Sequence, residues 1–259
     1  MANQVKEKIQ KGQKVVGTFF HMGGAIAAEA LGIAGLDFLL VDTEHAPFDV
    51  ESTTDVIRAA ELRGITPMVR VKDITRPAIL KMLDIGAKGL VIPCVRTVEE
   101  VQKIVEYGKY APIGSRGFIM ARAAGYGYAP IAADGIDAYM ERTNEEVLIL
   151  PQCETKECLE KIEEIAAIPG VDGIFIGPYD LTIALGKPAQ FSDPEVKAAF
   201  DRILKACRAA GKFAFIFTGS KEAARSYLEQ GFDAVTYNSD VITMIEAYQK
   251  ILGEIKGGE

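Results

Sequence analysis

Short runs of apolar and β-branched residues recur along the chain and alternate with longer stretches in which apolar positions repeat every three or four residues. The short runs predict eight strands, at residues 15–20, 38–41, 67–71, 89–92, 147–150, 173–176, 213–217 and 234–237. The longer stretches predict amphipathic helices, of which 49–64, 97–110, 193–211 and 220–231 are the clearest. Strands that alternate with helices in this way are typical of βα units around a parallel sheet.

The number of these units and the length of the chain together predict the fold class. Eight βα units in 259 residues, without a linker or a break in composition, fit an α/β protein with a single (β/α)₈ TIM barrel over residues 1–259. An open, doubly wound sheet is the alternative, and it would place a glycine-rich phosphate-binding pattern after the first strand. Gly23 and Gly24 supply only part of such a pattern, so we favour the barrel.

One connection departs from the regular alternation. Residues 111–135, between the fourth and fifth predicted strands, form a segment with several glycines and tyrosines that is too long for an ordinary connection. Long loops in compact domains are usually functional or disordered. We expect this segment to form a pocket wall or a contact between subunits.

The composition excludes several classes of function. The formal net charge is −7 and the basic residues are scattered, which argues against a nucleic-acid surface or an anionic membrane surface. No apolar run approaches the length of a membrane span, and the first residues lack the apolar core of a signal peptide. The four cysteines fit neither a zinc motif nor a disulfide framework. We therefore expect a cytoplasmic protein with reduced thiols.

Polar side chains follow several predicted strands at their carboxyl ends, which is where the active sites of (β/α)₈ barrels lie. They are far apart in sequence but share one rim of the barrel: His21, Asp42, Glu44, His45, Arg70, Gln152, Glu154 and Asp180. This convergence predicts an active site. Cys153 lies between two of these residues, but strand alternation points it to the opposite side, into the packing behind the rim.

Glu154 and Asp180 follow neighbouring strands, so their carboxylates can meet. Two anions share a site at neutral pH only if a positive charge compensates them. Together with waters and a bidentate oxygen ligand from a substrate, they would suit a hard divalent cation such as Mg²⁺ or Mn²⁺. The alternative is that each carboxylate caps the helix that follows it.

The remaining rim residues suggest acid–base and electrostatic roles. Arg70 either pairs with one of the acids or faces a substrate oxyanion, because a guanidinium stays charged and can hold carboxylate or enolate oxygens. His45 has a side chain whose ordinary pKa is near neutrality, which suits a proton-transfer role. His21 follows the first strand, and we expect it to be packed or hydrogen-bonded instead of catalytic.

Five motifs place these residues in a family. The chain contains DTEHAP at 42–47, VRV at 69–71, GSRGFIMARA at 114–123, LPQCET at 150–155 and GVDGIFIGPYDL at 170–181. In this order and spacing, from about Lys11 to the last helix, they resemble the metal-dependent class II 2-oxo-acid aldolases of the HpcH/HpaI family. The resemblance covers nearly the whole chain.

The resemblance implies a role for individual positions. Glu154 and Asp180 match the two metal-binding carboxylates, and His45 matches the general base. Arg70 matches the residue that stabilises the enolate and orients the keto oxygen. Asp84 matches an aspartate that pairs with the histidine and raises its basicity.

Further implications concern the substrate, the cofactor and the assembly. Gln152 matches a residue near the substrate, and the backbone amides from Gly177 through Tyr179 to Asp180 match those that hold the pyruvate carboxylate. The family implies a divalent cation, Mg²⁺ or Mn²⁺ first and Co²⁺ or Zn²⁺ as alternatives. It also implies a homo-oligomer, usually a hexamer, with pockets close to subunit contacts.

The hypothesis is a class II aldolase that cleaves or forms a 4-hydroxy-2-oxo acid through a metal-stabilised pyruvate enolate, with an aldehyde as the second product. Lys72 is the lysine nearest to a strand end, but it is flanked by charge, which argues against a Schiff-base route. The alternatives are a CoA-thioester lyase of the citrate-lyase β type, an oxaloacetate decarboxylase, a phosphate-binding barrel isomerase and a catalytically silent binding barrel.

Overall fold

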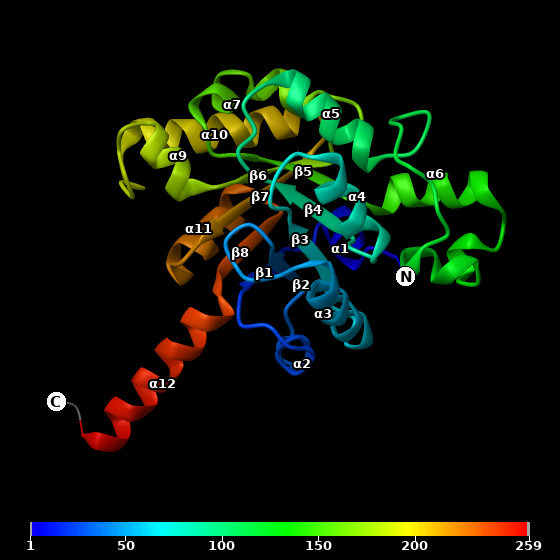
Figure 1. Ribbon diagram of the computed structural model, residues 1–259. Coiled ribbons are helices and arrows are strands. Elements are labelled where there is room, and N and C mark those ends of the chain that lie inside the picture. Colours follow the sequence, from blue (N-terminus) through cyan, green and yellow to red (C-terminus); the bar gives the residue numbers. More distant parts are fainter. Residues whose placement is uncertain (1, 258–259) are drawn as a thin grey trace.

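The computed structural model describes residues 2–257 and has the predicted architecture (Figure 1). Eight parallel strands close into a barrel in the order β1 to β8, and β8 pairs with β1. This closure excludes the open, doubly wound sheet. The strands are β1 (Val15–Phe20), β2 (Phe38–Asp42), β3 (Thr66–Arg70), β4 (Gly89–Ile92), β5 (Leu148–Cys153), β6 (Gly173–Ile176), β7 (Phe213–Thr218) and β8 (Ala234–Ser239).

Helices follow the strands and surround most of the barrel. Capping boxes start two of them, at Asp49 and Thr97. In each box the side chain of the capping residue accepts a hydrogen bond from the third N–H of the helix. The side chain of that third residue accepts one from the backbone N–H of the capping residue. The helices are α1 (Gln4–Gln10), α2 (Ala25–Ile33), α3 (Val50–Leu62), α4 (Arg76–Asp84), α5 (Val98–Gly108), α6 (Ile136–Glu146), α7 (Lys156–Glu160), α8 (Ile162–Ala166), α9 (Pro178–Ala184), α10 (Pro194–Ala209), α11 (Lys221–Gln230) and α12 (Asp240–Lys256).

Two apolar cores result from the alternation of side chains along the strands. One fills the barrel interior with residues such as Phe38, Met68 and Phe215, and α1 closes the amino-terminal end with Val5 and Ile9. The other lies between the barrel and its helices. Because the interior is filled, only the carboxyl-terminal rim remains for chemistry.

The predicted strand boundaries hold within a few residues, with one larger difference at β5. The prediction ended this strand before Pro151, but β5 continues to Cys153, and Pro151 is the register partner of Ile92. Gln152 therefore lies on the strand itself, facing the rim. Cys153 is fully buried in the outer core, as strand alternation predicted.

The segment 111–135 contains two short 3₁₀ turns, η1 (Arg122–Gly127) and η2 (Pro130–Ala132), and packs beside α6 on the outside of the barrel (Figure 1). Tyr110 and Tyr139 form its small core. No residue of 111–135 lines the two rim cavities described below, so within one chain it is not a pocket wall.

Candidate active site

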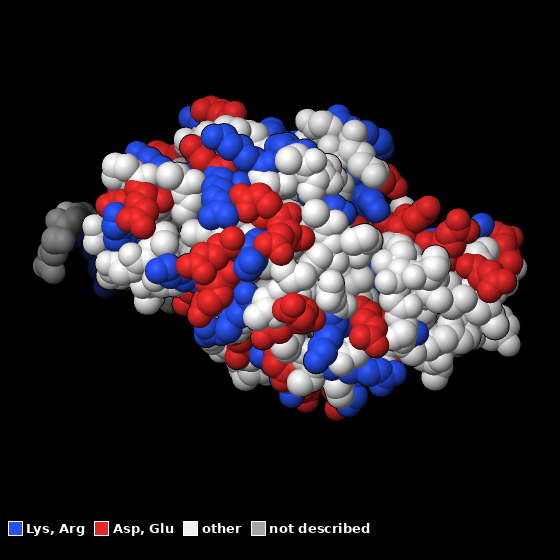
Figure 2. All heavy atoms as spheres, turned by 90° about the horizontal axis from the view of Figure 1, so that it is seen from above, with Lys and Arg blue, Asp and Glu red and all other residues white. Residues whose placement is uncertain are grey.

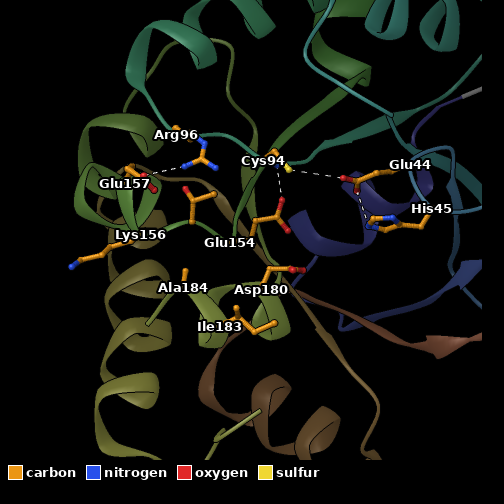
Figure 3. A pocket seen from close by; sticks show the side chains of 11 residues that line it. Glu44, His45, Cys94, Arg96, Glu154, Lys156, Glu157, Asp180, Ile183 and Ala184 are labelled. Carbon is orange, nitrogen blue, oxygen red and sulfur yellow. Dashed lines mark hydrogen bonds and ion pairs between the residues drawn. The ribbon is translucent and has the colours of Figure 1, made fainter. Parts of the chain in front are cut away.

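Two cavities open at the carboxyl ends of the strands and share His45 and Asp180 as lining residues. The outer cavity, of about 550 Å³, is lined by the segments after β2, β4 and β5 and by α9 (Figure 3). The inner cavity, of about 240 Å³, lies over the barrel interior, with Phe19, Phe175 and Phe217 as apolar walls. Their junction therefore joins a polar compartment to a smaller one with an aromatic lining.

Glu154 is held by groups from two neighbouring strand ends. The main-chain N–H of Cys94 donates to Glu154 Oε1 at 2.5 Å, and the side-chain amide of Gln152 donates to Oε2. Cys94 has a φ of 58°, an uncommon left-handed conformation for a residue with a side chain. Burial raises the pKa of Glu154 despite the bond from Cys94, and the negative charge of Asp180 raises it further.

Gly177, at the end of β6, lets the chain pass close to these carboxylate and amide groups. A Cβ added there would lie 2.7 Å from Gln152 Nε2 and 2.8 Å from Glu154 Oε2. The φ of Gly177 is −91°, so its requirement is space and not backbone conformation. Gln152 Oε1 is buried without a hydrogen-bond partner among the described residues. A buried acceptor of this kind indicates a missing donor or cation.

Asp180 lies in the first turn of α9 and is exposed. Figure 3 shows its side chain beside that of Glu154, facing the same cavity. Glu44 enters from the loop after β2, and burial raises its pKa although Arg70 and His45 oppose the shift. Three carboxylates thus face a shared space, which favours binding of a cation.

The residues at this junction fit a hard divalent cation. Among residues 2–257 no group of three or more His, Cys, Asp or Glu side chains is arranged to hold a metal by itself. Glu154 and Asp180 supply two carboxylates, and the unpartnered Gln152 Oε1 lies beside them. This all-oxygen donor set suits Mg²⁺ or Mn²⁺, which keep positions for water and substrate oxygens.

A second cluster is built around Asp42, the last residue of β2. Arg70 donates to both of its carboxylate oxygens, from Nε at 2.9 Å and from Nη2 at 2.7 Å, and His21 Nε2 lies 3.0 Å from Oδ2. Burial opposes ionisation of Asp42, but the bonds to His21 and Arg70 hold its pKa well below the usual range. The guanidinium also lies 4.5 Å from the centre of the Phe19 ring.

His45 extends from the loop after β2 and lines both cavities. Its backbone N–H donates to Asp42 Oδ1 at 3.3 Å, and its Nε2 lies 3.6 Å from Glu44 Oε2. The side chain is 68% exposed, so it can reach a ligand without displacing packed neighbours. His45 therefore lies at the rim, as expected, with the carboxylates of Asp42 and Glu44 close to it.

Asp84 is the predicted site residue that lies elsewhere. It ends α4 on the outside of the barrel, and its Oδ1 accepts from Arg116 Nη2 at 2.8 Å. Within the described chain Asp84 lines neither rim cavity. The carboxylates near His45 within one chain are Asp42 and Glu44. The pairing of Asp84 with His45 stays a prediction.

Sequence reasoning missed three features of the site. It placed Asp42 on the rim without a role, although Asp42 organises Arg70 and His21. It gave Cys94 no role, but Cys94 is exposed and its backbone N–H donates to Glu154. It did not identify the aromatic walls of the inner cavity. An aspartate directly before the TEH triplet was the available signal for the first feature.

Comparison with known proteins identifies the family. Residues 16–247 match the model described as HpcH/HpaI aldolase/citrate lyase. The chain belongs to this family. The family resemblance and the expected class, a carbon–carbon lyase, are therefore confirmed.

Individual relatives match over nearly the whole chain. The 2-keto-3-deoxy-L-rhamnonate aldolase of Escherichia coli (strain K12) is 33% identical over 261 residues, covering 100% of this chain and 95% of the relative. The crystal structure of an HpcH/HpaI aldolase from Desulfitobacterium hafniense DCB-2 has a TM-score of 0.90 and 28% identity, covering 98% of this chain and 97% of that chain. The crystal structure of the citrate synthase SbnG has a TM-score of 0.86 and 29% identity, covering 98% of both chains.

Proposed function

We propose that this member of the family is a class II aldolase that cleaves a 4-hydroxy-2-oxo acid to pyruvate and an aldehyde. The observation that carries the proposal is that Glu154 lines the outer cavity beside Asp180, which lines both cavities, while the unpartnered Gln152 Oε1 belongs to the inner one. A substrate bound across this junction would place its 2-oxo acid half in the inner cavity and its aldehyde half in the outer one.

Glu154 and Asp180 would hold the cation, for which we propose Mg²⁺ or Mn²⁺, with Co²⁺ or Zn²⁺ as alternatives. When bound, the ion supplies Lewis-acid stabilisation of negative charge on the keto oxygen. Gln152 and the backbone amides of Gly177, Tyr179 and Asp180 would orient the carboxylate of the substrate. All four residues line the inner cavity, which supports this assignment.

Arg70 contributes fixed positive charge. Its Nε and Nη2 are engaged by Asp42, which aims the guanidinium and leaves Nη1 for a substrate oxygen. Preorganised donors of this kind stabilise developing charge more effectively than donors that must reorient. As the bond between C3 and C4 breaks, its electron pair moves to form the enolate, and Arg70 faces the resulting oxyanion.

His45 would act as the general base, as the family resemblance implies. It takes the proton of the 4-hydroxyl as the aldehyde forms, and a proton is returned to C3 of the enolate to give pyruvate. Glu44 Oε2 lies 3.6 Å from His45 Nε2, so the two side chains face each other. Asp84 accepts from Arg116 within one chain, and the pairing with the base that the family resemblance implies stays a prediction.

We also propose that the protein is a cytoplasmic homo-oligomer, a hexamer by analogy with the family. Exposed apolar residues of segment 111–135, among them Phe118, Ile119 and Tyr128, support a subunit contact there.

The cysteines are free thiols, and three of the four are buried, which suits a reducing compartment. No helix among residues 2–257 has both the length and the apolar character needed to span a membrane. Figure 2 shows acidic and basic side chains intermixed on the face seen there, which does not suit nucleic acid.

The test is a screen for pyruvate release from 4-hydroxy-2-oxo acids, using protein treated with EDTA and then supplied with Mg²⁺, Mn²⁺, Co²⁺ or Zn²⁺. The proposal expects activity to be lost with EDTA and restored by one of these ions. Full activity after EDTA treatment, combined with a borohydride-trapped lysine adduct, would overturn it.

Carbon–carbon bond formation is a second candidate, favoured by the similarity to the citrate synthase SbnG. Addition of an enolate to a carbonyl acceptor is the reverse of the cleavage and uses the same residues. Incubation of the metal-loaded protein with oxo-acid donors and acceptors, followed by product detection, distinguishes the two reactions. Decarboxylation of oxaloacetate would appear in the same assay as pyruvate formed without an acceptor.

A further inference from the structure

A third cavity, of about 320 Å³, lies beside the inner cavity, next to the end of β7 and the first turn of α11. We call it the side cavity. Its walls are mainly aromatic, and among the described residues its lining includes no charged side chain. The aromatic residues are Tyr179 in α9, Phe191 in the loop after α9, Phe217 in β7 and Tyr227 in α11. The side cavity therefore suits an apolar group and not a cation.

One wall separates the side cavity from the inner cavity. Pro178, Tyr179 and Phe217 line both of them. The centre of the Tyr179 ring lies 6.0 Å from that of Phe217, and 5.1 Å from that of Phe191, which lines the side cavity but not the inner one. The planes of the Tyr179 and Phe191 rings are 84° apart, an edge-to-face arrangement that aromatic pairs prefer. The Tyr179 ring thus stands in the wall between the two cavities.

Tyr179 is the part of this wall that a substitution can remove without opening the core, because the residue is 45% exposed. The other apolar walls of the inner cavity differ. Phe19 and Phe175 are 7% and 1% exposed, and the centres of their rings lie 6.3 Å apart. Ile242 is exposed but does not line the side cavity. The Tyr179 ring therefore limits the size of the inner cavity on this side.

The backbone of Tyr179 is fixed by its neighbours. Pro178, at the start of α9, has a restricted φ, and the hydroxyl of the buried Thr182 donates to the carbonyl oxygen of Tyr179 at 2.7 Å. The ring can therefore leave the wall only by rotation about its own side-chain bonds. Such a rotation would break its contacts with Phe191 and Phe217. These contacts favour the closed wall.

We propose that Tyr179 is a specificity-determining residue, whose ring keeps the inner cavity closed to 2-oxo acids that carry an alkyl or aryl group on C3. This inference rests on the proposed function, in which the 2-oxo acid half of the substrate occupies the inner cavity. A pyruvate unit has only hydrogen on C3 besides the bond to C4, so it needs no space beyond the wall.

A larger group on C3 would have to enter the side cavity through the position of the Tyr179 ring. The outer cavity is not an alternative for an apolar group, because charged side chains such as Arg96 and Glu157 line it. In the proposed function the aldehyde half also occupies that space. The aromatic side cavity is thus the apolar space beside the reacting carbon, and Tyr179 closes it.

The test is the exchange of hydrogen on C3 for deuterium in D₂O, measured by NMR for the metal-loaded full chain. Removal of a proton from C3 forms the enolate, and a deuteron returned to C3 restores the 2-oxo acid, so no aldehyde is needed. The probes are pyruvate, 2-oxobutanoate, with a methyl group on C3, and 2-oxo-4-phenylbutanoate, with a benzyl group on C3. For wild type we expect kcat/KM of exchange to be about 10–200-fold lower for 2-oxobutanoate than for pyruvate, which is the discrimination typical of one carbon in an apolar site.

Tyr179→Ala should narrow this gap by at least about tenfold and make 2-oxo-4-phenylbutanoate a substrate. Tyr179→Phe keeps the ring and should keep the wild-type ratio. Ile183→Ala is the matched control, because Ile183 lies on the same helix and is 60% exposed but lines the outer cavity. Its ratio should also remain that of wild type. Circular dichroism checks that each variant is folded.

An unchanged ratio in folded Tyr179→Ala overturns the inference, and so does an equal narrowing in Ile183→Ala. If Tyr179→Ala does not fold, competition in wild type decides. Inhibition of pyruvate exchange by 2-oxo-4-phenylbutanoate that is as strong as inhibition by 2-oxobutanoate contradicts the closed wall. Wild type that exchanges pyruvate and 2-oxobutanoate equally contradicts only this inference. Wild type that exchanges neither, with Mg²⁺, Mn²⁺, Co²⁺ or Zn²⁺, contradicts the proposed function, on which the inference depends.

Discussion

Arg70 and Asp42 form a buried two-point ion pair, with Nε and Nη2 donating to Oδ1 and Oδ2 at 2.9 and 2.7 Å. The pair joins the ends of β2 and β3, where the two residues are register partners. It neutralises a buried guanidinium whose Nε also lies 3.3 Å from Glu44 Oε2. His21, which follows β1, lies against the same carboxylate, so Asp42 links the ends of three neighbouring strands.

Asp42→Asn should therefore destabilise the fold and reduce activity. Removing one partner of a buried pair costs about 3 kcal/mol. Because the folded-state pKa of Asp42 is lowered, its contribution to stability is present above the unfolded pKa and is lost as the pH falls below about 4. The variant should thus lose less stability than wild type between about pH 6 and pH 3. Urea unfolding across this range measures both effects.

Asp55→Asn is the control for this change. Asp55 also pairs with an arginine, Arg58, at 3.0 Å, but both side chains are more than half exposed. Exposed pairs contribute about 0–1 kcal/mol, so unfolding and its pH dependence should change little. Equal effects at Asp42 and Asp55 would contradict the role of the buried pair.

The fold was predictable because each strand carries a local signal. A run of buried β-branched residues, a turn and a helix-ending glycine recur, and closure follows from their number. The end of β5 was not predicted because Pro151 resembles a strand terminator in sequence, although a register partner accommodates it in the barrel.

The site was predictable only as far as a rim could be inferred. Glu154, Asp180, Arg70 and His45 follow strand ends, so the topology alone brings them together. The bond from the Cys94 backbone to Glu154 could not be predicted, because it depends on a left-handed φ that no residue type signals here. The apolar side chains of α12, such as Tyr248 and Ile255, are exposed, although their spacing in the sequence is typical of a helix that faces a core.

Gly177→Ala should impair the site through volume alone. The new Cβ would meet Gln152 Nε2 and Glu154 Oε2 at under 3 Å, displacing the amide and the proposed metal ligand. A displacement of about 1 Å can cost roughly 10²-fold in activity. Steady-state pyruvate release measures the loss, and Mn²⁺ affinity should fall with it.

Gly219→Ala is the matched control, because Gly219 follows β7 on the same rim and an added Cβ meets nothing within 4 Å. Its activity should remain within about twofold of wild type, as for substitutions away from special sites. If the two alanine variants behaved alike, close approach at Gly177 would not be the cause.

Glu154→Gln should stabilise the metal-free protein and abolish the stabilisation by added metal. Burial raises the folded-state pKa of Glu154, so the ionised carboxylate destabilises the metal-free fold as the pH rises above the unfolded pKa. Metal-free E154Q should melt higher than metal-free wild type at about pH 7, with the difference vanishing near pH 4. Added Mn²⁺ should raise the melting temperature of wild type only.

Activity of E154Q should fall by at least about 10²-fold, since a ligand is lost. Glu157→Gln provides the control, because Glu157 lines the same cavity but is 54% exposed and pairs with Arg96. It should retain the thermal shift with Mn²⁺. A shift that persists in E154Q would place the ion elsewhere.

His45→Asn and His21→Asn should separate the two histidines. Loss of a general base costs about 10²–10⁴-fold in kcat, and we expect this for His45, whose side chain is free to reach a substrate. His21 is held by Asp42, so its loss should alter KM more than kcat. Pre-steady-state pyruvate formation at several pH values measures the chemical step. A larger kcat defect in H21N would assign the base to His21.

Substitutions of Cys94 should act through the backbone and not through the thiol. At a φ of 58°, glycine is favoured over residues with a Cβ by about 1 kcal/mol, whereas a β-branched side chain is strongly disfavoured. Cys94→Gly should therefore raise the melting temperature, and Cys94→Val should lower it by the equivalent of about 2 kcal/mol. Because Cys94→Val also shifts the N–H that donates to Glu154 Oε1, it should weaken Mn²⁺ binding. Calorimetric titration of both variants tests this, and equally weakened binding in Cys94→Gly and Cys94→Val would show that the thiol and not the N–H serves the site.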